Sequence, residues 1–225
     1  MEISQNIIPQ LVIVLLWLGG VLSLATIVQQ FGTTEQVRKV VHIGTGNILP
    51  IAWYFHFPEW FCLTMGGIFC IITFLSYQLP ILPVINSVGR RTYGVFFYAL
   101  SITILVAWFW TIGKPQFAVL GVLVMTWGDG IAALIGQKWG KHPYEIYGNH
   151  KSWEGSMAMV IVCFIVTIAV LAISEGLTLT LLPIGLTVAI VATILEAISP
   201  SGSDNLSVPI GSGAIAYLLS FILIS

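Results

Sequence analysis

Long runs of apolar residues, separated by short polar breaks, follow one another along almost the whole chain. Each run is close to the roughly 20 residues that a helix needs to cross a hydrocarbon layer about 30 Å thick. The runs are continuously apolar and do not alternate between apolar and polar residues, which favours helices over the strands of a barrel. We therefore predict transmembrane helices at 8–29, 40–57, 60–80, 93–112, 116–136, 153–174, 177–198 and 207–224.

The composition agrees with this pattern. Hydrophobic residues make up 57% of the 225 residues and charged residues only 8%, which is far from the composition of soluble domains. We predict an all-α, polytopic membrane protein, a bundle of about seven to eight transmembrane helices. The length leaves no room for a separate soluble domain, so residues 1–225 are expected to form one transmembrane domain in the lipid bilayer. A net charge of −1 gives no indication of nucleic-acid binding.

Three cysteines, Cys62, Cys70 and Cys163, lie inside apolar runs and match no metal-ligand spacing. We interpret them as small apolar core residues and expect no disulfide framework. The first apolar run is long and has neither a basic leader nor a small-residue cleavage site. It is therefore expected to be a first membrane span and not a signal peptide that is removed.

The basic residues cluster in every second break between predicted spans: Arg38, Lys39, Arg90, Arg91, Lys138, Lys141 and Lys151. Under the positive-inside rule these breaks face the cytoplasm and both termini lie outside. The last break, 199–207, falls on the same side. Polar residues that are far apart in the sequence are then expected to meet at the cytoplasmic face, where a single active site can use them.

The charged residues are concentrated in the stretch 127–156, WGDGIAALIGQKWGKHPYEIYGNHKSWEGS. Ionisable groups are costly in so apolar a protein unless they meet water, a partner or a substrate, so this stretch is a candidate functional site. In its first half Gly128, Ala132 and Gly136 recur at helical spacing and form a small-residue face, suited to a nucleotide or to a neighbouring helix. A polar hairpin rich in Gly, Pro, Asn and Tyr follows over 140–150 and is predicted to be a loop.

The second half of the stretch opens another helix. Lys151 precedes Ser152, Glu154 and Gly155, and a helix start offers free N–H groups and a positive dipole end to a phosphate. The segment is not a Walker A loop, because GNHKS lacks the glycine before the lysine.

A second acidic segment, EAISPSGSDNLSV, lies at 196–208. Asp204 and Asn205 offer hard oxygen ligands, and with Asp129 they are suited to a Mg²⁺ that bridges phosphate oxygens. Carboxylates and a lysine on one face of an apolar protein indicate phosphoryl transfer to or from a lipid-soluble molecule.

These motifs resemble those of a known family. GDGIAALIGQKWGK, KSWEGS and EAISPSGSDNLSVPI, with RKVVH at 38–42 and RRTYG at 90–94, are similar to the motifs of the CTP-dependent polyprenol kinases, which include dolichol and phytol kinases. The resemblance is closest to phytol kinases and covers nearly all of 38–210. It implies transfer of a phosphoryl group from CTP or UTP to an isoprenoid alcohol, with Mg²⁺.

Site residues follow from the resemblance together with the spacing. Asp129, Lys151, Glu154 and Asp204 are expected to be catalytic, with Asp129 and Asp204 holding Mg²⁺ and either Glu154 or Asp204 taking the proton of the alcohol. The substrate- and nucleotide-binding residues are expected to be Arg38, His42, Gly128, Gly136, Ser152, Gly155 and Asn205.

Structural roles and rival functions stay open at this point. Glu154 is also explained by the helix dipole, Asp204 and Asn205 by an ordinary turn, and His42 by packing. A phosphatidate cytidylyltransferase uses CTP at a similar pattern and releases pyrophosphate, and a diacylglycerol kinase of the same CTP-dependent type takes a different acceptor. A transporter is a third alternative, although transporters place polar groups near the bilayer midplane.

Overall fold

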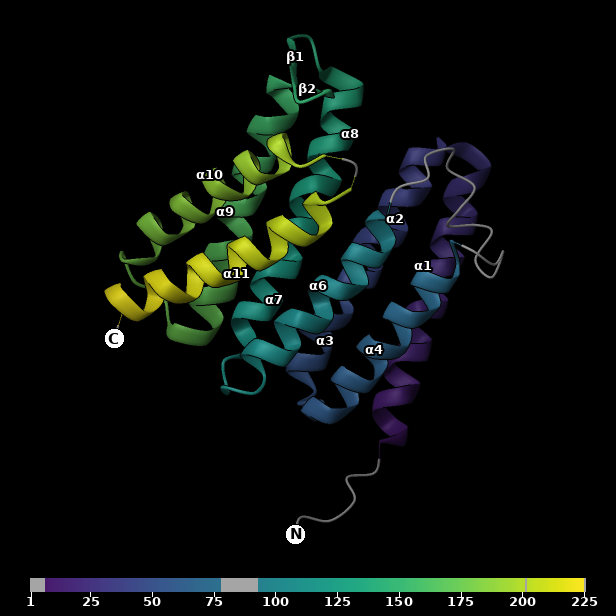
Figure 1. The fold of residues 1–225 in the computed structure, drawn as a ribbon, viewed down its shortest axis with the longest axis vertical. Coiled ribbons are helices and arrows are strands. Elements are labelled where there is room, and N and C mark those ends of the chain that lie inside the picture. Colours follow the sequence, from purple (N-terminus) through teal and green to yellow (C-terminus); the bar gives the residue numbers. More distant parts are fainter. Residues whose placement is uncertain (1–6, 78–92, 201, 225) are drawn as a thin grey trace.

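The computed structural model describes residues 7–77, 93–200 and 202–224, which form a bundle of helices (Figure 1). Within these residues, five helical segments are long and apolar enough to cross a membrane. They are α1 (Ile8–Phe31), the continuous segment Pro115–Trp139, α9 (Trp153–Glu175), α10 (Leu181–Ile198) and α11 (Asp204–Leu223). Two shorter apolar helices are α4 (Glu59–Leu75) and α6 (Gly94–Phe109).

The all-α membrane architecture is confirmed, but within the part of the chain that the structure describes fewer helices reach the spanning length than the seven to eight expected. The predicted span 40–57 is two helices, α2 (Thr34–Gly46) and α3 (Ile48–Tyr54), which meet at Asn47. Pro50 has no backbone N–H to donate to the carbonyl oxygen of Gly46, so a helical hydrogen bond is missing where the two helices meet. At its other end α2 begins before Arg38, because Thr33 and Gln36 form a reciprocal capping box. Arg38 and Lys39 therefore lie on a helix and not in a break.

A central helical segment changes its winding on the way to the site. It consists of α7 (Pro115–Leu123), a π-helical stretch (Val124–Asp129) and α8 (Gly130–Trp139). Residues 116–122 are all buried among neighbouring helices. π-Helical turns are rare and are frequently found at functional sites. Here the π-helical stretch ends on Asp129.

The core surrounds this central segment. Leu120, Met125, Leu105 and Met159 are fully buried and belong to one cluster that α6, α9, α10 and α11 complete. A Cβ atom on Gly121 would lie 2.3 Å from the carbonyl oxygen of Pro209 on α11, so this contact requires glycine. The close packing of α7 against α11 brings the N-terminal end of α11 near the π-helical stretch.

A β-hairpin occupies the segment that was predicted to be a loop. Strands β1 (Pro143–Ile146) and β2 (Asn149–Ser152) pair antiparallel around Tyr147 and Gly148, whose φ values are 49° and 78°. Two consecutive residues with positive φ make the kind of two-residue turn that matches the twist of paired strands. The amide of Asn149 donates to the carbonyl oxygens of Ala197 and Ser199, which attaches the hairpin to the end of α10.

The polar junctions lie together. The junction of α1 and α2, the hairpin and the link between α10 and α11 are all in the upper part of Figure 1, whereas the first turn of α1 and the last turn of α11 lie lower in the view. This grouping agrees with the convergence that the basic residues predicted. Arg90 and Arg91, which contributed to that prediction, lie outside the described residues.

Candidate functional site

The inward face of α2 carries the first part of the site. The Nζ atom of Lys39 donates a hydrogen bond to Oδ2 of Asp129 at 2.5 Å, and the Lys39 side chain is only 4% exposed. The neighbouring Arg38 binds both carboxylate oxygens of Glu35, through Nε at 2.8 Å and Nη2 at 2.6 Å. Two cations of α2 are therefore held by carboxylates, one on the same helix and one at the end of the π-helical stretch.

Lys151 brings the hairpin into the same site. Its ammonium group forms an ion pair with Glu196, a buried residue near the end of α10. Burial alone would lower the pKa of Lys151, but the carboxylates of Glu196, Asp129 and Asp204 outweigh burial and raise it above its ordinary value. Lys151 is thus a fixed positive charge among three carboxylates that come from three different helical segments.

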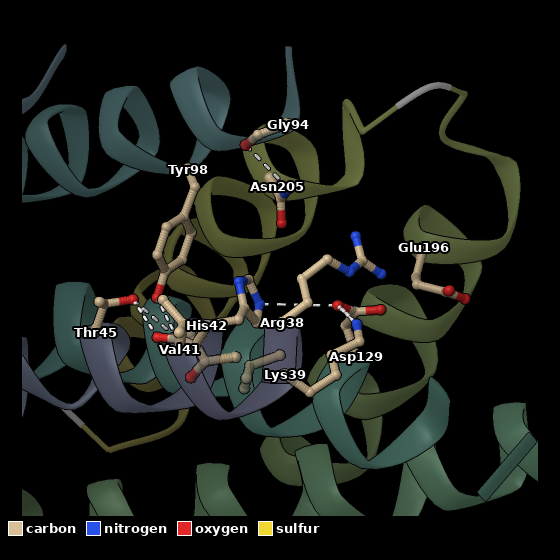
Figure 2. Close-up of polar contacts among 12 residues, drawn as sticks. Arg38, Lys39, Val41, His42, Thr45, Gly94, Tyr98, Asp129, Glu196 and Asn205 are labelled. Atoms are coloured by element: carbon tan, nitrogen blue, oxygen red, sulfur yellow. Dashed lines mark hydrogen bonds and ion pairs between the residues drawn. The ribbon is translucent and has the colours of Figure 1, made fainter. Parts of the chain in front are cut away.

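The start of α11 contributes polar atoms without partners. The Nδ2 atom of Asn205 donates to the carbonyl oxygen of Gly94 at 3.0 Å, which orients the amide (Figure 2). Oδ1 of Asn205 and Oδ1 of Asp204 are buried and have no hydrogen-bond partner among the described residues. Buried polar atoms are normally satisfied, so these two oxygens are available to a ligand.

His42 lies one helical turn after Arg38 and Lys39. Its Nε2 atom is 3.8 Å from Oδ2 of Asp129, and its ring packs against Tyr98 with 4.7 Å between centroids. Burial, with Lys39 as the next contributor, lowers the pKa of His42 to about 4. The imidazole is therefore neutral at pH 7, so it adds no positive charge to a site that already contains cations.

We call this set of residues the charged cluster. It combines side chains from α2, the π-helical stretch, β2, α10 and α11: Arg38, Lys39, His42, Asp129, Lys151, Glu196, Asp204 and Asn205. In Figure 2 the side chains of Lys39 and His42 point toward Asp129. Glu196 lies to the right of Asp129, and Asn205 lies above these residues. The structure thus brings together Asp129, Lys151 and Asp204, as the predicted site requires, while their individual roles stay predictions.

Glu154 is not brought to the charged cluster. Its Oε1 atom is 2.6 Å from Nδ1 of His142, and its Oε2 atom accepts a hydrogen bond from the backbone N–H of the same residue. Its carboxylate lines an apolar groove of about 550 Å³ formed mainly with side chains of α9. The structure therefore gives Glu154 a structural partner near the start of α9 and separates it from Asp129.

The small residues of the predicted nucleotide site pack helices together. A Cβ atom on Gly128 would lie 2.6 Å from Sγ of Cys163, and one on Gly155 would lie 3.0 Å from the carbonyl oxygen of Ala132. Gly136 faces Ser152 and Gly155 in the same α8–α9 contact, and the Ser152 hydroxyl caps α9 by accepting from Gly155 N–H. The sequence leaves two alternatives for this small-residue face, a nucleotide or a neighbouring helix. In the structure the neighbouring helix packs against it.

Two residues of the charged cluster were given other roles by the sequence reasoning. In the basic-residue pattern Lys39 is interpreted as a topology signal, and the sequence assigns no role in the site to Glu196, the first residue of the second acidic segment. The capping box at Thr33 was the signal that would have placed Lys39 on a helix. No local pattern indicated that Glu196 pairs with Lys151, because that pairing depends on the hairpin docking on α10.

The donor set fits a magnesium ion. Among the described residues no group of three or more His, Cys, Asp and Glu side chains is placed to hold a metal by itself. Mg²⁺, however, is usually bound by one or two carboxylates and by substrate phosphates. Asp129 and Asp204 are the two carboxylates of the charged cluster that would hold such an ion, and Oδ1 of Asp204 has no hydrogen-bond partner among the described residues.

Comparison with known proteins decides the family. Over 208 residues the chain is 46% identical to a phytol kinase of Synechocystis sp., a match that covers 92% of this chain and 89% of that protein. The chain belongs to the phytol kinase family. Phytol kinase 1 of Arabidopsis thaliana, a chloroplastic protein, is 31% identical over 206 residues, which cover 80% of this chain and 65% of the plant protein.

A farnesol kinase is also among the relatives. This chloroplastic protein of Arabidopsis thaliana is 26% identical over 208 residues, which cover 81% of this chain and 65% of the relative. No family model matches the chain, and no solved structure matches it. Membership in the family confirms the prediction that the chain is a kinase with an alcohol acceptor.

Proposed function

We propose that the chain transfers the terminal phosphoryl group of CTP to the hydroxyl of an isoprenoid alcohol, with phytol as the main acceptor. The observation that carries the proposal is the 46% identity, over nearly the whole chain, to a phytol kinase. The farnesol kinase among the relatives supports an isoprenoid acceptor in general. The choice of CTP rests on the resemblance of the GDG, KSWEGS and SDN motifs to those of CTP-dependent kinases.

In the proposed reaction the hydroxyl oxygen of the alcohol attacks the terminal phosphorus of the nucleotide. The new P–O bond forms while the bond to the bridging oxygen breaks, and the nucleoside diphosphate leaves. Lys151 and Arg38 stabilise the negative charge on the transferred group. Asp204, whose Oδ1 atom is buried and unpartnered among the described residues, accepts the hydroxyl proton.

Asp129 and Asp204 are the residues proposed to hold Mg²⁺. When bound, the ion neutralises charge on the nucleotide phosphates. The contacts of Asp129 to Lys39 and His42 both involve Oδ2, so neither of them occupies Oδ1. Lys39 then fixes the orientation of the Asp129 carboxylate.

The active site is proposed to face the cytoplasm. Basic residues at the junction of α1 and α2 and in the hairpin support this orientation. The acceptor reaches the site from the bilayer, because an isoprenoid alcohol partitions into lipid, and the nucleotide reaches it from water.

The test is product analysis with purified protein in phosphatidylcholine vesicles. Each of CTP, UTP, ATP and GTP, labelled at the terminal phosphate, is offered with phytol, geranylgeraniol, farnesol and diacylglycerol. The proposal predicts labelled phytyl phosphate and CDP, with a requirement for Mg²⁺. Release of pyrophosphate would indicate a cytidylyltransferase, and preferential labelling of diacylglycerol would indicate a different lipid kinase.

A further inference from the structure

An apolar groove of about 870 Å³ lies between α1, α2 and the segment that carries Asp129. Its wall on α1 includes Trp17, Leu24 and Ile27, and Trp127 and Leu134 close the opposite side. The polar side chains that line it with a charge or an amide are Gln36, Lys39 and Asn47, all on or at the end of α2. The volume falls within the roughly 300–1,000 Å³ range of small-molecule sites.

The groove and the charged cluster share Lys39. This lysine lines the groove, and its Nζ atom binds Oδ2 of Asp129. Ile43, another lining residue, packs so closely on the residue after Asp129 that a Cβ atom on Gly130 would lie 2.7 Å from its Cδ1 atom. The groove therefore leads directly to the carboxylate that the phosphoryl transfer uses.

We propose that this groove binds the hydrocarbon tail of the isoprenoid alcohol, with its hydroxyl at Lys39 beside Asp129. The inference rests on the proposed function and adds the tail-binding site to it. A long apolar molecule with one polar group matches a long apolar groove whose lining includes one charged residue, Lys39. A nucleotide does not fit this description, because its phosphates require several donors or cations along the wall.

The exposure of α1 fits an acceptor that arrives from the lipid. Groove residues on this helix, including Leu16, Leu24 and Ile27, are exposed large apolar side chains. The groove therefore opens laterally toward the lipid. An alcohol dissolved in the bilayer can enter it without crossing water. The smaller groove on α9 lacks the connection to the charged cluster, because its polar residue is Glu154, which is paired with His142.

The packing of α1 against α2 shows how far Gly20 lies from Lys39 along the groove. A Cβ atom on Gly44 would lie 2.5 Å from the Val21 side chain, so these two positions are at the same level. Gly44 follows Lys39 by five residues, which corresponds to about 7.5 Å along the helix axis. Gly20, next to Val21 and lining the groove, therefore marks a point well along the tail from the hydroxyl.

Two adjacent glycines provide a matched pair of variants. A Cβ atom on Gly19 or on Gly20 would meet no atom within 4 Å, so a larger side chain fits at either position. Only Gly20 lines the groove. Both positions are exposed on α1, and replacing glycine within a helix removes the same propensity penalty in each case. Gly20→Leu fills the groove, whereas Gly19→Leu is the control.

The first measurement is steady-state kinetics in phosphatidylcholine vesicles with phytol and the much shorter prenol. Gly20→Leu is expected to raise the KM for phytol by about tenfold, the effect of one or two methylene groups in an apolar pocket. The KM for prenol, whose short chain ends before the level of Gly20, and the KM for CTP stay within about twofold of wild type. Gly19→Leu leaves all three unchanged. Equal phytol KM values for the two variants would overturn the proposal.

The second measurement separates this proposal from the proposed function. Wild-type protein in the same vesicles, without nucleotide, is labelled with a photoreactive isoprenoid alcohol, and the cross-linked peptides are identified by mass spectrometry. Labels on α1 and α2 that phytol displaces, and that Gly20→Leu removes while Gly19→Leu does not, support the groove even where turnover fails. Labels elsewhere, or labels that phytol does not displace, mean that the groove holds only membrane lipid and overturn the proposal.

Discussion

Lys39 and Asp129 are 90 residues apart in the sequence, yet Nζ of the lysine lies 2.5 Å from Oδ2 of the aspartate. Their side chains are 4% and 14% exposed, so both charges are withdrawn from water. Removing one partner of such a pair leaves an uncompensated buried charge, which is far more costly than removing both. The pair therefore fixes α2 to the end of the π-helical stretch and orients the carboxylate at the centre of the charged cluster.

Replacing Lys39 by methionine is expected to lower the free energy of unfolding by about 3–5 kcal/mol. The double variant Lys39→Met, Asp129→Asn is expected to recover most of that lost stability, because no buried charge is left unpaired. It is expected to have no kinase activity, because the Asp129 carboxylate is missing. Thermal unfolding in detergent and turnover with phytol measure the two effects. Lys114→Met is the control, since Lys114 is exposed. A stable and active Lys39→Met protein would contradict the role given to this pair.

At Asp204 we expect a substitution to reduce turnover strongly while changing stability little. Its Oδ1 atom is buried and unpartnered among the described residues, and an asparagine still offers an acceptor oxygen to the backbone N–H of Asn205, so Asp204→Asn is expected to change stability by less than about 1 kcal/mol. Turnover is expected to fall by about 100-fold or more, because the proposed proton acceptor and metal ligand is lost. Measuring turnover against Mg²⁺ concentration tests this. Wild-type turnover would exclude Asp204 from the reaction.

Much of the fold could be predicted because hydrophobic length is a strong signal. The apolar runs gave the positions of the long helices, and the basic residues predicted that the polar junctions gather at one end. The break at Asn47 was missed, since an apolar run on either side of Pro50 hides the interruption. The strand pairing within the polar hairpin was missed because its turn depends on Tyr147 adopting a positive φ, which sequence patterns for β-turns do not assign to tyrosine.

The site was predictable only in part. Asp129, Lys151 and Asp204 stand out as ionisable groups in an apolar chain, and the structure brings them together. Glu154 stands out equally well, yet it binds His142. In the sequence, a glutamate in the first turn of a helix is compatible both with a catalytic role and with a structural role. Only the docking of the hairpin on α10 decides which side chains point inward.

Glu154→Gln therefore provides a test of that distinction. We expect turnover within about threefold of wild type, because a glutamine still accepts the backbone hydrogen bond from His142 and the charged cluster is untouched. The measurement is kcat and KM with phytol and CTP, compared with Asp204→Asn under the same conditions. A loss of turnover comparable to that of Asp204→Asn would return Glu154 to the catalytic residues.

Gly128 tests whether the small-residue face packs a helix or binds a nucleotide. Gly128→Ala places a Cβ atom 2.6 Å from Sγ of Cys163 and is expected to lower the free energy of unfolding by about 1–3 kcal/mol. Cys163→Ala in the same chain removes the obstructing sulfur and is expected to restore most of that stability, with Cys163→Ala alone as the control. Thermal unfolding measures the rescue. A raised KM for CTP that the second substitution leaves unchanged would favour nucleotide binding instead.

The central claim is that the charged cluster performs the phosphoryl transfer, and Asp129→Asn tests it most directly. The amide keeps an oxygen for Lys39, and Glu35, whose Oε1 atom is 3.9 Å from Nζ of Lys39, remains as a countercharge, so the protein is expected to fold with reduced stability, which thermal unfolding in detergent verifies. The decisive measurement is the rate at which this folded variant transfers labelled phosphate from CTP to phytol in phosphatidylcholine vesicles. We predict a fall of about 100-fold to 1,000-fold relative to wild type. A folded Asp129→Asn protein that turns over at the wild-type rate would contradict the account.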